Sequence, residues 1–300
     1  MLEALSLVRS LKDSLALVNR IPPEVLSFIS DYYMDMCYMD QALISLTHVC
    51  RGWRETFISR SSLWAHLDLT SVDKTQTYIR SSKSSPLRVH VEVYLNQALS
   101  LAIPQIPRLR SLTICTDAIP DALRHCRCRA PLLEVIDVTS PGQILDSALF
   151  DGDLSSLHEL SLAGVTTDLP WTNMANLGIL NLSFPPRHKV TVARLLDFLE
   201  SAPLLHTIVM VDSIPNSSDS PPGRVVSLRR LNTLTIYADP VHSILNHLCI
   251  PTDASPMVWT TFRGETSPLL YYLPETSPSI SNLWHITAVN LCFHAKDKCA

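Results

Sequence analysis

Few residues in this 300-residue sequence have the types and spacing that catalysis or metal binding requires. His125, Cys126 and Cys128 offer three metal-ligating side chains, but no second spaced pair accompanies them and arginines crowd the group. We interpret them as ordinary thiols and arginines near a helix end. His242 and His247 are five positions apart, a poor spacing for sharing one ligand from a helix. We therefore expect no metal site.

The sequence also lacks the motifs of nucleotide-binding proteins and of hydrolases. The two closest glycines, Gly142 and Gly152, are ten positions apart, so neither a P-loop nor a dinucleotide-binding fingerprint can be written. The sequence contains no GxSxG nucleophile elbow and no HExxH zinc motif. A hydrolase or transferase is therefore an alternative without a candidate nucleophile and base. We expect a non-catalytic protein that uses no cofactor.

Composition narrows the class of partner. A formal net charge of -4, with 17% charged residues, offers no basic field for nucleic acid or for a membrane surface. The eight cysteines lack the dense framework of a small secreted scaffold, so we interpret them as reduced thiols. Neither a secretory signal nor an apolar run long enough to span a membrane is found. We expect a soluble protein of the cytoplasm, the nucleus or both.

The N-terminal part of the chain is predicted to be helical. Apolar residues recur every three or four positions from Leu2 to Val18, which favours an amphipathic helix. A second helix should begin at Ile21-Pro22-Pro23-Glu24, because proline suits the first helical turn and a carboxylate complements the helix dipole there. Residues 41–57 show the spacing of a third helix. The apolar face of the second helix is expected to comprise Val25, Leu26, Phe28 and Ile29.

These residues carry a resemblance to a known family. The blocks Ile21-Pro22-Pro23-Glu24-Val25-Leu26, Ala42-Leu43, Val49-Cys50-Arg51-Gly52-Trp53-Arg54 and Ser62-Leu63-Trp64 follow one another in the order and at the gaps of an F-box. Residues 19–68 resemble in particular the F-box of the large fungal F-box families. The resemblance implies a helical bundle that docks on a Skp-type adaptor, which ties it to the cullin scaffold of a ubiquitin ligase.

The surface implied for this docking consists of apolar side chains that so small a module cannot cover by itself. Trp53 is expected to be the strongest single anchor, because large aromatics dominate interface energetics. The alternative is that Leu46, Val49 and Trp53 only form the core of the bundle. The expected adaptor-binding residues are Ile21, Pro22, Pro23, Glu24, Val25, Leu26, Ile29, Leu43, Leu46, Val49, Cys50 and Trp53.

Beyond the F-box, an apolar residue at i, i+3 and i+5 returns six times. Successive units start 20 to 28 residues apart, close to the period of leucine-rich repeats. Trp64, Leu67 and Leu69 form a candidate first unit, and Leu283, Ile286 and Ala288 a candidate last one, with one eroded unit expected before it. The six units are Leu109, Leu112, Ile114; Leu133, Ile136, Val138; Leu157, Leu160, Leu162; Leu177, Leu180, Leu182; Leu205, Ile208, Met210; and Leu231, Leu234, Ile236.

Each unit is predicted to be a strand, a turn and a helix. Val192 to Leu199 shows a helical stripe, residues 120–128 repeat that arrangement, and residues 216–223 form a polar loop. The expected fold class is α/β: a small N-terminal F-box helical bundle at residues 19–68, after an N-terminal helix at 1–18, followed by a leucine-rich-repeat-like α/β solenoid at 69–300. The Asn or Cys of regular repeats is missing and no polar C-terminal cap is visible, so we leave open a degenerate or truncated end.

In such strands the residues between the apolar ones face outward. This outward set is small, neutral and rich in hydroxyl groups, without the arginine cluster that binds phosphorylated segments. We expect a partner recognised without phosphate; the alternative is a solvated sheet face with binding on the loops. The expected substrate-binding residues are Thr113, Asp137, Glu159, Ser161, Asn181, Thr207, Thr235 and Tyr237.

The resemblance and the repeats together predict a substrate-recognition adaptor of a Skp-cullin-F-box ubiquitin ligase. The F-box would bind the Skp-type adaptor, and the repeats would hold a protein marked for ubiquitin-dependent degradation. The alternative is a non-catalytic repeat scaffold whose F-box no longer recruits a ligase. The sequence does not name the substrate.

Overall fold

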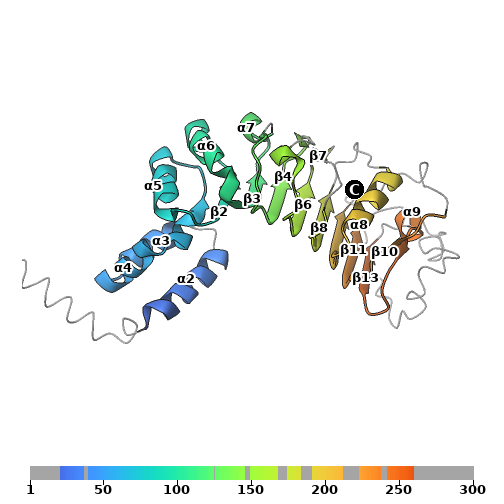
Figure 1. The fold of residues 1–300 in the computed structure, drawn as a ribbon, viewed down its shortest axis with the longest axis horizontal. Helices are drawn as coiled ribbons and strands as arrows, with labels where there is room; N and C mark the ends of the chain where they lie inside the picture. The colour runs from blue at the N-terminus through green and yellow to red at the C-terminus, as the bar shows by residue number, and fades with distance from the viewer. Residues whose placement is uncertain are drawn as a thin grey trace, which may run out of the picture. The chain divides into compact units, whose positions relative to one another are not determined.

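The protein is a mixed α/β fold with a parallel, open sheet (Figure 1). A computed structural model describes residues 21–36, 40–124, 126–145, 149–167, 174–183, 191–211, 223–237 and 242–259. The chain divides into two compact units, unit 1 (residues 1–173) and unit 2 (residues 174–300). This division falls inside the predicted repeat region. The predicted helix at 2–18 and the candidate unit at Leu283 lie outside the described residues.

Unit 1 begins with a helical module, which consists of α2 (Pro23–Met36), α3 (Asp40–Thr47), α4 (Arg51–Ser59) and the 3-10 helix η2 (Ser61–Ala65). The prediction of one helix over 41–57 is wrong, because the chain breaks between α3 and α4. Cys50 is extended, with φ -155° and ψ 176°. The Thr47 hydroxyl donates to the carbonyl oxygen of Ile44 (2.7 Å), and Nε of Arg54 donates to the carbonyl oxygen of Thr47 (2.9 Å). These bonds satisfy helix-end groups that a continuous helix would have paired internally.

The core of this module is apolar and fully enclosed. Leu26, Leu43, Phe57 and Leu63 are at most 5% exposed. Trp64 fixes the end of the module, because its indole Nε1 donates to the carbonyl oxygen of Phe57 (3.0 Å). Its ring also packs edge-on against Tyr78, with centroids 5.2 Å apart. The helical module is thereby tied to the next helix, α5 (Val72–Ser82).

Five strands of unit 1 pair in parallel, and each strand lies next to the one that precedes it in the chain, in the order β1, β2, β3, β4 and β6. Helices α5, α6 and α7 lie along the same side of it (Figure 1). The strands are β1 (His66–Leu67), β2 (Leu87–Val91), β3 (Leu109–Cys115), β4 (Val135–Thr139) and β6 (Glu159–Ala163). The connections contain α6 (Asn96–Ala102), η3 (Ile103–Arg108), α7 (Asp121–Arg124), β5 (Ile144–Leu145), η4 (Leu149–Gly152) and β7 (Thr166–Thr167).

Unit 2 repeats this arrangement with four parallel strands: β8 (Ile179–Ser183), β9 (Thr207–Val211), β11 (Thr233–Tyr237) and β13 (Ser255–Trp259). They pair in that order, each in register with the next. The connections contain α8 (Val192–Ser201), α9 (His242–Leu245) and a small parallel pair, β10 (Val226–Ser227) with β12 (Leu248–Cys249). The described helices of both units include none that is long and apolar enough to cross a bilayer.

The apolar pattern of the six repeat units is confirmed. All of its positions are at most 3% exposed, and they alternate with accessible residues along each strand. Strand β2 was missed because Leu87, Val89 and Val91 follow strict alternation, without the i, i+3 spacing of the other units. Strand β13 lies in the gap where an eroded unit was expected.

The prediction of a helix after every strand is only partly right. The stripe at Val192 to Leu199 is helical, as α8, and helices also follow β1 and β2. The helix predicted within 120–128 shrinks to the single turn α7. Between β4 and β6 the described chain forms β5 and η4 instead, and β5 pairs in parallel with β7.

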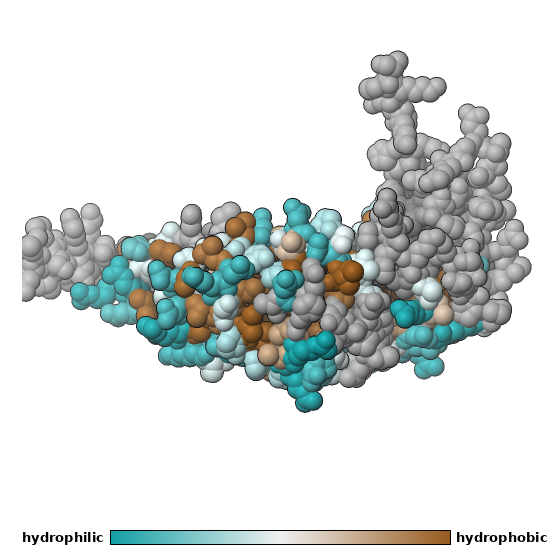
Figure 2. Space-filling model, turned by 90° about the horizontal axis from the view of Figure 1, so that it is seen from above, coloured by the Kyte–Doolittle hydropathy of each residue, from teal (hydrophilic) through white to brown (hydrophobic). Residues whose placement is uncertain are grey.

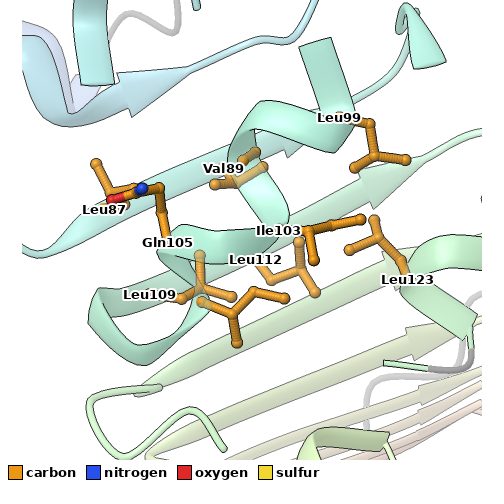
Figure 3. Close-up of a pocket in the computed structure, with 10 residues that line it drawn as sticks. Leu87, Val89, Leu99, Ile103, Gln105, Leu109, Leu112 and Leu123 are labelled. Atoms are coloured by element: carbon orange, nitrogen blue, oxygen red, sulfur yellow. The ribbon is translucent and has the colours of Figure 1, made fainter. Parts of the chain in front are cut away.

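The helix layer of unit 1 packs on β2 and β3 through aliphatic side chains. Figure 3 shows Leu99 and Ile103 on the helical side facing Val89 and Leu112 on the strands. The cavity left between them is about 20 Å³, little more than one water molecule needs, and its walls are almost wholly apolar. We interpret it as a packing gap.

Candidate interaction surfaces

Helix α2 separates its residues onto a buried face and an exposed apolar face. Leu26, Ser27 and Ser30 are buried, at 5%, 5% and 2% exposure. The exposed apolar face, called here the α2 stripe, consists of Val25 (45%), Phe28 (74%), Ile29 (54%) and Tyr32 (70%). These four positions follow the i, i+3, i+4, i+7 spacing of one helix face. The helix therefore covers the core with one side and presents a second apolar side to solvent.

Two prolines set the start of this surface. Pro22 and Pro23 are exposed at the beginning of α2, where a missing backbone N–H costs no helical hydrogen bond. The backbone N–H of Leu26 donates to the carbonyl oxygen of Pro22 (3.0 Å), which closes the first turn. The position of the α2 stripe is thus fixed by the Ile21-Pro22-Pro23-Glu24 block that begins the motif.

The α2 stripe differs from the other exposed apolar side chains of unit 1. Ile44, Val49 and Ile58 are 48 to 55% exposed on α3, α4 and the turn between them. Elsewhere, exposed Val93, Leu132 and Ile144 lie on separate connections between strands, and Figure 2 shows apolar side chains mixed with hydrophilic ones on the side seen from above. Single exposed apolar residues are normal on protein surfaces, whereas a group on one helix face indicates an interaction surface.

The expected adaptor-binding residues occupy three kinds of position. Pro22, Pro23, Glu24, Val25, Ile29 and Val49 are exposed, whereas Ile21, Leu46, Cys50 and Trp53 are half-buried. Leu26 and Leu43 are buried, and this corrects their assignment: both side chains belong to the core of the module and cannot contact a partner directly.

Sequence reasoning missed four exposed apolar residues: Phe28, Tyr32, Ile44 and Ile58. Phe28 had been placed on the same apolar face as Leu26. The signal that could have separated them is the spacing of Val25, Phe28, Ile29 and Tyr32, which defines a face of its own.

Trp53 is part of the fold of the module as well as a candidate contact. Its ring meets Phe57 edge-on, with centroids 5.6 Å apart, and Phe57 is 1% exposed. The indole Nε1 is buried, and among the described residues no acceptor lies within hydrogen-bonding distance. Replacing Trp53 would therefore disturb the core, so a test of binding needs a variant on the α2 stripe.

The outward face of the unit 1 sheet carries charged residues. In the register of the strands, His90, Thr113, Asp137 and Ser161 form one lateral row. Arg88, Ser111, Val135 and Glu159 form the adjacent row. Burial raises the pKa of the Cys115 thiol, and the negative charges of Asp137 and Glu92 raise it further. This face therefore gathers carboxylates around a half-buried thiol.

The outward face of the unit 2 sheet is uncharged. Its central row is Asn181, Val209, Thr235 and Met257, aligned across the four strands. One flanking row is Ile179, Thr207, Thr233 and Ser255, and the other is Ser183, Val211 and Tyr237. Tyr237 and Met257 are 39% and 50% exposed.

The expected substrate-binding residues are all accessible, and the structure brings some of them together. Thr113, Asp137 and Ser161 share one row in unit 1, with Glu159 in the next row. In unit 2, Asn181 and Thr235 share a row, and Thr207 and Tyr237 lie in the rows on either side. Arg88 and His90 were missed along with strand β2.

Of the residues first considered for metal binding, His125 and the side chain of His242 lie outside what the structure describes. Cys126 is buried and Cys128 is exposed. His247 is 7% exposed, and its Nδ1 lies 2.7 Å from the carbonyl oxygen of Arg224. Within the described ranges, no three His, Cys, Asp or Glu side chains come close enough together to hold a metal ion.

Comparison with known proteins assigns no family to this chain. No protein-family model matches the sequence, and no curated protein matches it. The F-box resemblance and the assignment of the strands to leucine-rich repeats therefore stay predictions.

Proposed function

We propose that this chain is the substrate-recognition adaptor of a Skp-cullin-F-box ubiquitin ligase. In this proposal residues 19–68 act as the F-box and bind a Skp-type adaptor, and through it a cullin scaffold. Residues 69–300 act as a leucine-rich-repeat-like solenoid that holds a protein substrate. The protein would work in the cytoplasm, the nucleus or both. The observation that carries the proposal is the exposed α2 stripe, which begins directly after the Pro22-Pro23 block.

The α2 stripe supports the proposal on energetic grounds. Burying a large apolar side chain against a partner contributes roughly 1.5 to 3 kcal/mol. Phe28 and Tyr32 are more than two-thirds exposed, so most of that contribution is still available for binding. Aromatic residues also dominate the energetics of protein interfaces. Because the core is already closed by Leu26, Leu43 and Phe57, a partner can use the stripe without unfolding the module.

The proposed mechanism involves no covalent chemistry on this chain. One part is held by the ligase, the other holds the substrate, and the chain thereby raises the local concentration of the substrate near the ubiquitin donor. The outward faces of the strands in the two units, whose residues are accessible between buried apolar ones, support a role in holding a protein.

A binding measurement with matched variants tests the proposal. Phe28→Asp places a charge in the α2 stripe, and Val93→Asp makes the same change at an exposed apolar residue outside the helical module, 69% accessible. We expect purified Skp adaptor to bind the wild type and Val93→Asp equally. Phe28→Asp should weaken binding at least about tenfold, which corresponds to about 1.4 kcal/mol. Circular dichroism checks that both variants are folded.

Two results would count against the proposal. Equal binding by Phe28→Asp and Val93→Asp would exclude the α2 stripe as the contact. No binding by a folded wild type would leave the alternative of a repeat scaffold without ligase recruitment.

A further inference from the structure

The sheet face of unit 2 is uncharged at every outward position whose side chain the structure describes. Eleven such residues lie on β8, β9, β11 and β13, counted from the three aligned rows described above, and none is Asp, Glu, Lys, Arg or His. The corresponding rows of unit 1 contain Arg88, His90, Asp137 and Glu159. The two faces therefore offer different chemistry to a partner.

Apolar side chains on this face occupy neighbouring positions. Val209 and Val211 lie on β9, Tyr237 pairs with Val211, and Met257 lies two strands from Val209 in the central row. Adjacent strands are roughly 4.8 Å apart, so these side chains form one continuous area. None of the four is buried, and Tyr237 and Met257 are the most exposed of them. Methionine adapts its packing to a partner, and tyrosine offers a large apolar ring with a hydroxyl that can form a hydrogen bond.

Hydrogen-bonding groups border this apolar area. Asn181 and Thr235 share the central row with Val209, and Thr207 and Thr233 lie in the adjacent row. Their amide and hydroxyl groups can donate to and accept from the backbone of an extended chain. None of them can neutralise a charged side chain or clamp a phosphate as arginine does.

We propose that this face binds an uncharged segment of the substrate protein that is rich in aliphatic and aromatic side chains. The inference rests on the proposed function, in which the repeat region holds the substrate, and it names the chemical class of what is held. A charged side chain placed on this face would lose water without gaining a counter-charge, which is costly. The face therefore discriminates against acidic, basic and phosphorylated segments.

A peptide-selection experiment on the full chain tests this inference. The immobilised wild type is used to select from a random peptide display library, and the most enriched peptide is synthesised as the probe. We expect enriched peptides to lack charge and to contain several aliphatic or aromatic residues. Their affinity should change less than about twofold between low and physiological salt, because no ion pairs are screened.

Paired variants locate the binding face. Thr235→Lys introduces a charge in the central row of unit 2, and Ser111→Lys introduces the same charge in a row of unit 1. The synthesised peptide should bind Thr235→Lys at least tenfold more weakly than wild type and should bind Ser111→Lys unchanged. Tyr237→Ala, at a surface position, provides a second variant should Thr235→Lys fail to fold, and it should also weaken binding.

The outcomes separate this inference from the proposed function. Enrichment of charged peptides, no enrichment at all, or equal binding to Thr235→Lys and wild type would overturn the inference. Thr235→Lys should retain Skp adaptor binding, and Phe28→Asp should retain peptide binding. A wild type that binds the peptide but not the adaptor would contradict the proposed function while leaving the uncharged face as a peptide-binding surface.

Discussion

Phe28 and Tyr32 lie four residues apart on α2, so their side chains, 74% and 70% exposed, follow each other by one helical turn on the same face. Ser27, which directly precedes Phe28, and Ser30, which lies between Phe28 and Tyr32 in the sequence, are both buried. The helix is therefore apolar on the side that faces solvent and partly polar on the side that faces the module. Exposed apolar side chains grouped on one helix face in this way are typical of an interaction surface.

The first prediction concerns stability and compares two neighbours in α3. Leu43 is fully buried and Ile44 is 48% exposed. Leu43→Ala should lower the free energy of unfolding by roughly 2 to 5 kcal/mol, because it leaves a cavity in the core. Ile44→Ala should change it by less than about 1 kcal/mol, since only a partly exposed side chain is shortened. Urea denaturation followed by circular dichroism measures both. Equal losses would show that the buried and exposed sides of α3 are wrongly assigned.

A second prediction concerns Arg108, which joins η3 to α5. Its guanidinium donates to the carbonyl oxygen of Ser85 (2.8 Å) and to the hydroxyl of Ser82 (3.1 Å). Burial lowers the pKa of Arg108. Arg108→Met should destabilise the protein by roughly 1 to 3 kcal/mol, because two part-buried acceptors lose a charged donor. Thermal unfolding at constant pH measures the change.

The control for this prediction is Arg110, two residues away. Nε of Arg110 lies 2.8 Å from a carboxylate oxygen of Glu134, but both side chains are well exposed. Arg110→Met should therefore cost no more than about 1 kcal/mol, the usual range for a surface ion pair. An effect as large as that of Arg108→Met would contradict the difference in burial.

A third prediction concerns the reactivity of Cys115 on the unit 1 sheet face. Burial, then the charges of Asp137 and Glu92, raise the pKa of its thiol, so less thiolate is present at a given pH. Thiolate is the form that reacts with iodoacetamide. Asp137→Asn removes one of the negative charges, so it should lower the pKa of Cys115 and accelerate its alkylation at mildly alkaline pH. Peptide mass spectrometry over time measures the rate.

Glu159→Gln supplies the matched control for this experiment. It removes a charge from the same sheet face, but Glu159 lies on β6, two strands from Cys115 and four positions before Ala163, the β6 residue in the row of Cys115. Its effect on the alkylation rate of Cys115 should be negligible. A similar acceleration in both variants would indicate a general loosening of the sheet rather than a local charge effect.

The repeat strands could be predicted from the sequence because a strand that is buried on one side has apolar residues at every second position. Leu112 and Ile114, like their counterparts in the other units, are separated by one outward residue, and both are 1% exposed. Strand β2 was not predicted, because Leu87 lies two residues before Val89, whereas the repeat pattern requires three. A bulge between Leu87 and Arg88 restores the register with β3, and no local sequence pattern reveals it.

The helical module was harder to predict, because some of its apolar residues form the core and others are exposed to solvent. Leu26 and Ile29 have similar side chains and lie three positions apart, yet one is 5% exposed and the other 54%. Hydropathy cannot separate a core residue from an interface residue; only the packing of α2 against the rest of the module does. The break at Cys50 was missed for a related reason, since it depends on the bond from Arg54 to Thr47 across the turn.

Hydrogen exchange on adding purified Skp adaptor to the wild-type chain tests the central proposal most directly. We predict that amides of α2, and of the turn between α3 and α4 that carries Val49, become protected while those of β3 and β4 are unchanged. Protection should saturate as adaptor is added and should be lost in Phe28→Asp. A folded chain whose α2 amides exchange at the same rate with and without adaptor would contradict the proposal that the α2 stripe recruits a ubiquitin ligase.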